Sequence, residues 1–93
     1  MTIAILLINL FVPQANSLKS KRQVVKSMKD RIRHKFNVSI AEIGDTDKWQ
    51  STTLAIACVN SNKRFVDSVL SKIVNLVDTQ AGVELVDYKI EFY

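Results

Sequence analysis

The chain has 93 residues, of which 47% are hydrophobic, and this length predicts one domain, residues 1–93, with a single core. Its formal net charge is +4 at pH 7, which makes anionic partners more plausible than cationic ones. A single cysteine excludes an internal disulfide and any zinc site built on several thiolates.

The first segment, Ile3–Val12, is rich in Ile, Leu and Val and ends at Pro13. Proline cannot donate to a strand ladder, so the pattern predicts a buried strand that stops there. Ten residues are too few to cross a bilayer, and neither a basic region nor a cleavage site flanks the segment. We therefore expect no signal peptide and no membrane partner. Cys58, in an apolar run, fits a buried thiol in a reducing cytoplasm.

The next segment predicts an amphipathic helix. Ser17 is a good N-cap, and apolar residues then recur at spacings of three, four and seven up to about Lys35. The apolar stripe contains Leu18, Val25, Met28, Ile32 and Phe36.

The remainder predicts three more strands and one helix. Val38–Ile43 and Thr52–Val59 are apolar enough for strands, and the polar residues 44–48 between them favour a turn. A second apolar stripe runs from Phe65 to Val77, after cap candidates at 60–62. Alternation over Val86–Phe92 predicts a half-buried last strand.

The order βαββαβ with right-handed crossovers predicts a ferredoxin-like fold. This is an α+β two-layer sandwich with an antiparallel sheet in the order 4-1-3-2 and both helices on one face. The topology brings the start of the first helix to the turn between strands two and three.

Charge is concentrated in the first helix, which holds eight of the thirteen Lys and Arg residues against a single acid, Asp30. This segment therefore carries +7, and the rest of the chain carries −3, because five cations meet eight acids there. The eight cations are Lys19, Lys21, Arg22, Lys26, Lys29, Arg31, Arg33 and Lys35.

The first three cations form a candidate site for a small anion or a phosphate. Lys19, Lys21 and Arg22 stand in a first helical turn, where the helix dipole favours acids, so stability alone does not explain them. Lys21 points toward the apolar stripe and would have to reach out past the end of the sheet. The alternative is that the three pair with Asp45 and Asp47 in the adjoining turn.

The rest of the helix predicts contact with RNA or the ribosome, mainly through phosphates. The candidate residues are Lys26, Lys29, Arg31, Arg33, Lys35 and, for stacking on a base, Trp49. The alternatives are a solvated charged surface for the helix and a packing role for Trp49.

The face of the sheet away from the helices carries apolar residues of the first strand, namely Ile5, Leu7 and Phe11. Exposed apolar patches usually bury in a partner, so a homodimer formed through this face is the alternative function. An enzyme is not expected, because His34 is the single histidine and no nucleophile, metal or phosphate-loop motif occurs. No cofactor is expected either.

Two long segments resemble the YlxP-like family of small bacterial proteins. Residues 17–27, SLKSKRQVVKS, resemble its S-L-K-x-K-R-x-V-V-K-S signature, and residues 36–50 resemble its F-N-V-S-V-A-E-V-G-D-x-D-x-W-Q block. The sequence departs from the family at Leu7 and Phe11, where polar residues are usual. The resemblance implies a bacterial cytoplasmic protein with the fold given above, and it implies no established activity.

Overall fold

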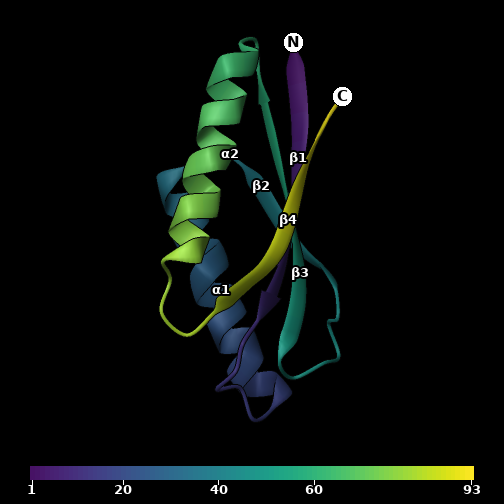
Figure 1. The fold of residues 1–93 in the computed structure, drawn as a ribbon, viewed down its shortest axis with the longest axis vertical. Helices are drawn as coiled ribbons and strands as arrows, with labels where there is room; N and C mark the ends of the chain where they lie inside the picture. Colours follow the sequence, from purple (N-terminus) through teal and green to yellow (C-terminus); the bar gives the residue numbers. More distant parts are fainter.

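The computed structural model describes residues 1–93, and its element order confirms the predicted βαββαβ arrangement (Figure 1). The six elements are β1 (Thr2–Phe11), α1 (Leu18–Lys35), β2 (Ser39–Gly44), β3 (Ser51–Asn60), α2 (Lys63–Asp78) and β4 (Glu84–Phe92).

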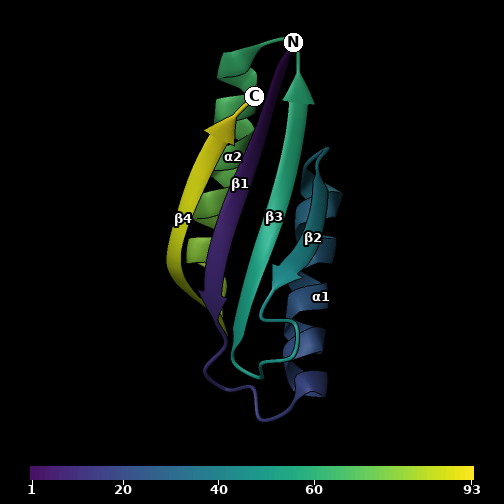
Figure 2. The ribbon, with the colours of Figure 1, turned by 90° about the vertical axis from the view of Figure 1, so that its right-hand side faces the viewer.

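The strands form one antiparallel sheet in the order β2-β3-β1-β4, which is the predicted order read from the opposite edge. Both helices lie behind the sheet in Figure 2, so the face turned to the viewer is not covered by a helix. The ferredoxin-like α+β sandwich predicted from the sequence is therefore confirmed. Neither α1 nor α2 combines the length and the apolar character that a membrane crossing requires.

The core lies between the sheet and the two helices. Alternate residues of the central strands, such as Leu6 and Ile8 on β1 and Ile56 on β3, are fully buried there. They meet Ile32 of α1 and Leu70 of α2, which are also fully buried. Burying each such side chain stabilises the fold by about 1.5–3 kcal/mol. Contacts in this layer therefore hold α1 against the sheet.

The boundaries of α1 follow from its terminal residues. Ser17 is the N-cap, and its Oγ accepts a hydrogen bond from the Ser20 amide at 3.0 Å. The Ser20 Oγ in turn accepts from the Ser17 amide at 3.3 Å, which completes a capping box with serine in the usual Glu or Gln position. The helix ends before Phe36, whose amide still donates to Ile32. The predicted start and end are confirmed.

The last strand is more exposed than predicted, since Tyr88 is 50% exposed and Phe92 is 42% exposed. The pairing with β1 shifts between Asn9 and Leu10, so that Val86 becomes an extra, unpaired residue. As a result Leu85 turns toward the core, whereas Val86, predicted to be half-buried, is 63% exposed. A β-bulge reverses the alternation within the strand, and the sequence pattern alone did not reveal it.

Candidate nucleic-acid interface

The positive charge of α1 is only partly neutralised within the molecule. Three of its eight cations have an acidic partner within 4 Å: Lys21 with Glu42, and Lys26 and Arg33 with Asp30. The other five, which have no such partner, are Lys19, Arg22, Lys29, Arg31 and Lys35. The unpaired cations are the first requirement for a surface that attracts phosphates.

Lys21 corrects the prediction of an anion site at the start of α1. Its side chain is fully buried, and its ammonium group lies 3.1 Å from Glu42 Oε2. It also donates to the carbonyl oxygens of Asp45, at 2.7 Å, and Ser51, at 3.1 Å. The ammonium group is buried among two carbonyl oxygens and a carboxylate of the protein itself, so Lys21 is not available to an external anion.

The residues around Lys21 are arranged to hold this charge. Glu42 faces the helices because it lies two residues after the buried Ile40 and opposite the buried Leu54, and its carboxylate also accepts from Thr52 Oγ1. A bulge at Ile43 then shifts the pairing of β2 with β3. Gly44 follows the bulge, where an added Cβ would lie 3.1 Å from Thr53. Asp45 has a φ of 57°, a left-handed conformation that this residue type tolerates. The turn therefore presents its carbonyl groups to Lys21.

The other two cations of the predicted anion site remain on the surface. Lys19 and Arg22 are exposed and pair with neither Asp45 nor Asp47. The Asp45 carboxylate pairs instead with Lys48, at 3.3 Å, so the alternative of pairing within the turn is wrong for these two residues. The Ser20 amide at the helix start already donates to Ser17 in the capping box. The side chains of Lys19 and Arg22 therefore remain as the groups that could bind an anion there.

One groove runs along α1 on the side of β2, with a volume of about 350 Å³. Arg33 anchors it by donating to the Ile40 carbonyl oxygen of β2 at 3.0 Å. Asp30 accepts from Lys26 at 2.6 Å, and chiefly this hydrogen bond holds the pKa of Asp30 below its usual value, with Arg33 and Lys29 adding to the effect. The groove is lined by Arg22, Val25, Lys26, Lys29, Asp30, Arg33 and Glu42.

A second groove, of about 370 Å³, lies between α1 and α2. Three cations line it, Arg31 and Lys35 from α1 and Lys72 from α2, and no carboxylate does. Its other lining residues are Phe36, Asn75, Leu76 and Thr79. Lys72 was not predicted as a site residue, although it is a cation on the polar side of the apolar stripe from Phe65 to Val77.

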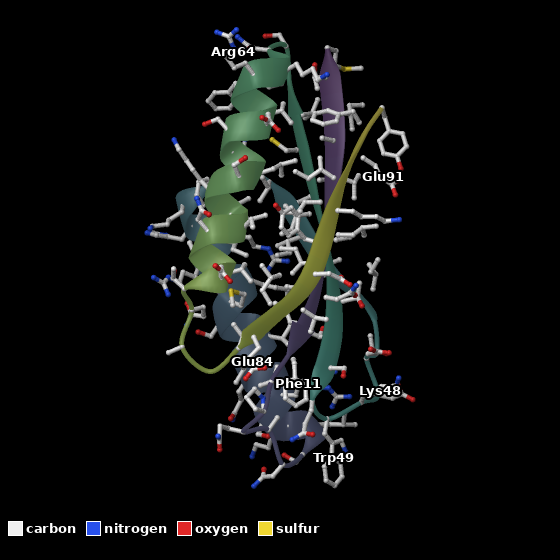
Figure 3. The ribbon with its side chains drawn as sticks, viewed as in Figure 1. Phe11, Lys48, Trp49, Arg64, Glu84 and Glu91 are labelled. Atoms are coloured by element: carbon white, nitrogen blue, oxygen red, sulfur yellow. The ribbon has the colours of Figure 1, made fainter.

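Trp49 lies in the loop between β2 and β3, and 57% of it is exposed. Figure 3 shows it at one end of the molecule, with its ring turned away from the strands. A packing role at the end of the sheet does not account for that exposure. The loop lies near the start of α1, to which Lys21 ties it through Asp45.

The open face of the sheet carries Ile5, Leu7 and Phe11, each of them half-buried. Ile5 stands opposite Ala57 of β3 and Leu7 stands opposite Ala55. On the other side β4 places charged residues beside this row, with Glu91 opposite Ile5 and Lys89 opposite Leu7. The face thus combines an apolar row with a charged edge.

His34 is exposed on α1, away from the core. The His, Cys, Asp and Glu side chains form no group of three or more that could hold a metal ion. Cys58 is 4% exposed, and burial raises the pKa of its thiol.

Comparison with known proteins shows the family to which the chain belongs. Residues 3–90 match the family described as "Protein of unknown function (DUF503)". The "Uncharacterized protein YlxP" of Bacillus subtilis (strain 168) is 38% identical over 79 residues, which cover 85% of this chain and 86% of that protein. A solved structure, "De novo designed protein Foldit4", is similar with a TM-score of 0.57 and 7% identity, over 100% of this chain and 97% of that one. This last likeness shows the fold alone.

Proposed function

The chain belongs to the DUF503 family of proteins of unknown function, which agrees with its resemblance to YlxP-like sequences. From the geometry of α1 we propose that it is a non-enzymatic RNA-binding protein. In this proposal α1 contacts the phosphates of RNA, either free or within the ribosome. The observation that carries the proposal is the set of five cations on α1 that no acid of the molecule neutralises.

Electrostatics favours a polyanion over a solvated surface. Acids are abundant elsewhere in the chain, yet Asp30 is the only one on α1. A surface adapted for solubility alone would mix the two signs, because like charges spaced three or four residues apart on a helix destabilise it. A phosphate backbone relieves this repulsion and releases condensed counterions when it binds.

The proposal predicts a steep dependence of RNA affinity on salt. Each phosphate contact contributes about −0.7 to −0.9 to the slope of log K against log salt. Five contacts would give a slope of about −4, which fluorescence anisotropy on a labelled structured RNA can measure between 50 and roughly 200 mM salt.

Neutralising substitutions on α1 test where the RNA binds. Lys29→Gln combined with Arg31→Gln should weaken binding and reduce the magnitude of the slope by about 2. The matched control is Lys48→Gln with Lys89→Gln, which removes the same charge from residues that are not on α1 and should leave the slope unchanged. Equal effects of the two pairs would assign the binding to net charge and contradict a role for α1.

The open face of the sheet supports a second candidate function, a homodimeric interaction protein with a protein or small-anion partner. No helix covers the open face of the sheet (Figure 2), and a second copy could bury its apolar residues Ile5, Leu7 and Phe11. Light scattering after size exclusion would then give a dimer mass, and Leu7→Glu would give a monomer. A monomeric wild-type protein would end this candidate. We place either activity in the cytoplasm, which fits the free thiol of Cys58.

A further inference from the structure

Four of the five unpaired cations of α1 fall into two rows on opposite flanks of the helix. Each residue of an α-helix turns the chain by about 100°, so positions two apart, such as Lys29 and Arg31, point about 200° away from each other. Arg22 and Lys29 form the row beside β2 together with Arg33, which also pairs with Asp30, and Arg31 and Lys35 form the row beside α2. Lys19, in the first turn, lines neither groove. The two grooves described above confirm this division, because each row lines a different groove.

The row beside α2 is extended by a residue from another element. Lys72 of α2 shares the groove with Arg31 and Lys35, and none of the three has a carboxylate within 4 Å. Arg31 donates to the side-chain oxygen of Gln80 just after α2, which ties its guanidinium to this side of the helix. Three cations without an acid attract a phosphate group to this groove.

The ridge between the two rows has a different chemistry. It consists of Gln23, Ser27, Asp30 and His34, which follow one another at spacings of four, three and four and are all exposed. None is Lys or Arg, and the charge of Asp30 is offset by Lys26 and Arg33. The ridge therefore offers an amide, a hydroxyl and an imidazole, with cations on both of its sides.

We propose that the partner is double-stranded RNA, whose shallow minor groove lies over this ridge with one phosphate backbone on each row. The inference rests on the proposed function and adds the class of RNA. A duplex presents two phosphate rows separated by a groove, and the A-form minor groove is wide, shallow and lined by 2′-hydroxyl groups. Gln23, Ser27 and His34 have the hydrogen-bonding groups that such hydroxyls require.

Other nucleic acids fit the two rows less well. A single strand has one backbone and binds by stacking its bases on aromatic side chains, and the ridge has no Phe, Tyr or Trp. The minor groove of B-DNA is about 6 Å wide, which is narrower than a helix with its side chains. The major groove of B-DNA is about 8.5 Å deep. Because α1 is flanked by β2 on one side and α2 on the other, it forms a low ridge, which suits a shallow groove.

The test compares four probes of one sequence: a duplex RNA of about 20 base pairs, its two single strands and the matching DNA duplex. Competition at fixed salt should show that the duplex RNA binds tightest. Lys35→Gln with Lys72→Gln neutralises two of the three cations of the row beside α2, and Arg22→Gln with Lys29→Gln neutralises two of the three beside β2. Each pair should weaken duplex binding by about tenfold, while circular dichroism shows that the variants remain folded.

The outcomes separate the two levels of the proposal. Binding of single strands as tight as that of the duplex would overturn the duplex inference and leave RNA binding intact. Equal affinity for the DNA duplex, or duplex affinity unchanged by Lys35→Gln with Lys72→Gln, would also overturn the inference. Failure of every RNA probe to bind would overturn the proposed function itself.

Discussion

Lys21 is a cation that the fold uses internally. The sequence placed it near the apolar stripe of α1, and its ammonium group meets a carboxylate and two carbonyl oxygens at the end of the sheet. Burying an ammonium group is costly unless every donor is satisfied, which explains why Glu42 and two backbone carbonyls converge on it. The +7 charge of the segment therefore overstates the charge that a ligand meets.

Replacing Lys21 by Met should destabilise the protein markedly. The substitution leaves Glu42 without its counterion, and removing one partner of a buried pair costs about 3–5 kcal/mol. Because the Glu42 side chain retains 15% exposure, we expect the lower end, about 3 kcal/mol, from urea unfolding. Lys19→Met, at an exposed and unpaired position, is the control and should change stability by less than about 0.5 kcal/mol. Equal unfolding midpoints for the two variants would contradict the structural role of Lys21.

Cys58 should be an unreactive thiol in the folded protein. Its side chain lines the core at 4% exposure, and burial raises the pKa of the thiol, which lowers the fraction of reactive thiolate at neutral pH. A colorimetric disulfide reagent should modify the native protein much more slowly than the protein in denaturant. Equal rates in the two conditions would show that the thiol is accessible.

At the scale of the element, α1 was well predicted because its signals are local. Ser17 and the apolar spacing up to Phe36 fix its ends and its buried face, and the structure agrees with both. The bulges at Ile43 and Val86 were not predicted, because they depend on how neighbouring strands pair. The bulge at Ile43 lies between Glu42 and Asp45, whose carbonyl oxygen accepts from Lys21.

Ser17→Ala should destabilise α1 at its start. The serine hydroxyl accepts from the Ser20 amide, and losing such an N-cap typically costs about 1 kcal/mol. Thermal unfolding followed by circular dichroism measures the loss. Ser71→Ala, at an exposed position inside α2, is the matched control, and it should be neutral or slightly stabilising because alanine favours helix. The capping box would be refuted if both variants melted at the same temperature.

At the scale of the whole molecule, tertiary structure divides the charge that the sequence concentrates. The ferredoxin-like topology and the basic character of α1 could be predicted from the order of elements and the composition. The pairing of Lys21 with Glu42 and the position of Lys72 beside Arg31 could not, because residues distant in the chain meet only in the folded protein. The distinction between buried, paired and free cations follows from these contacts.

The long shape of the molecule gives α1 an extended surface. The protein measures 42 × 20 × 19 Å, and α1 occupies one end of the long axis while α2 reaches the other (Figure 1). Arg64, at the start of α2, lies at the end opposite Trp49 (Figure 3). Trp49→Ala should therefore affect only RNA that extends past the start of α1, which footprinting with RNA probes of increasing length can measure. A loss of affinity that is the same for every length would contradict this placement.

The most direct measurement is the affinity of the wild-type protein for a structured RNA as a function of salt. Five phosphate contacts by the unpaired cations of α1 predict that log K falls against log salt with a slope of about −4, and that Lys29→Gln with Arg31→Gln lowers its magnitude by about 2. An affinity that does not change with salt, or no binding at low salt, would contradict RNA recognition by α1.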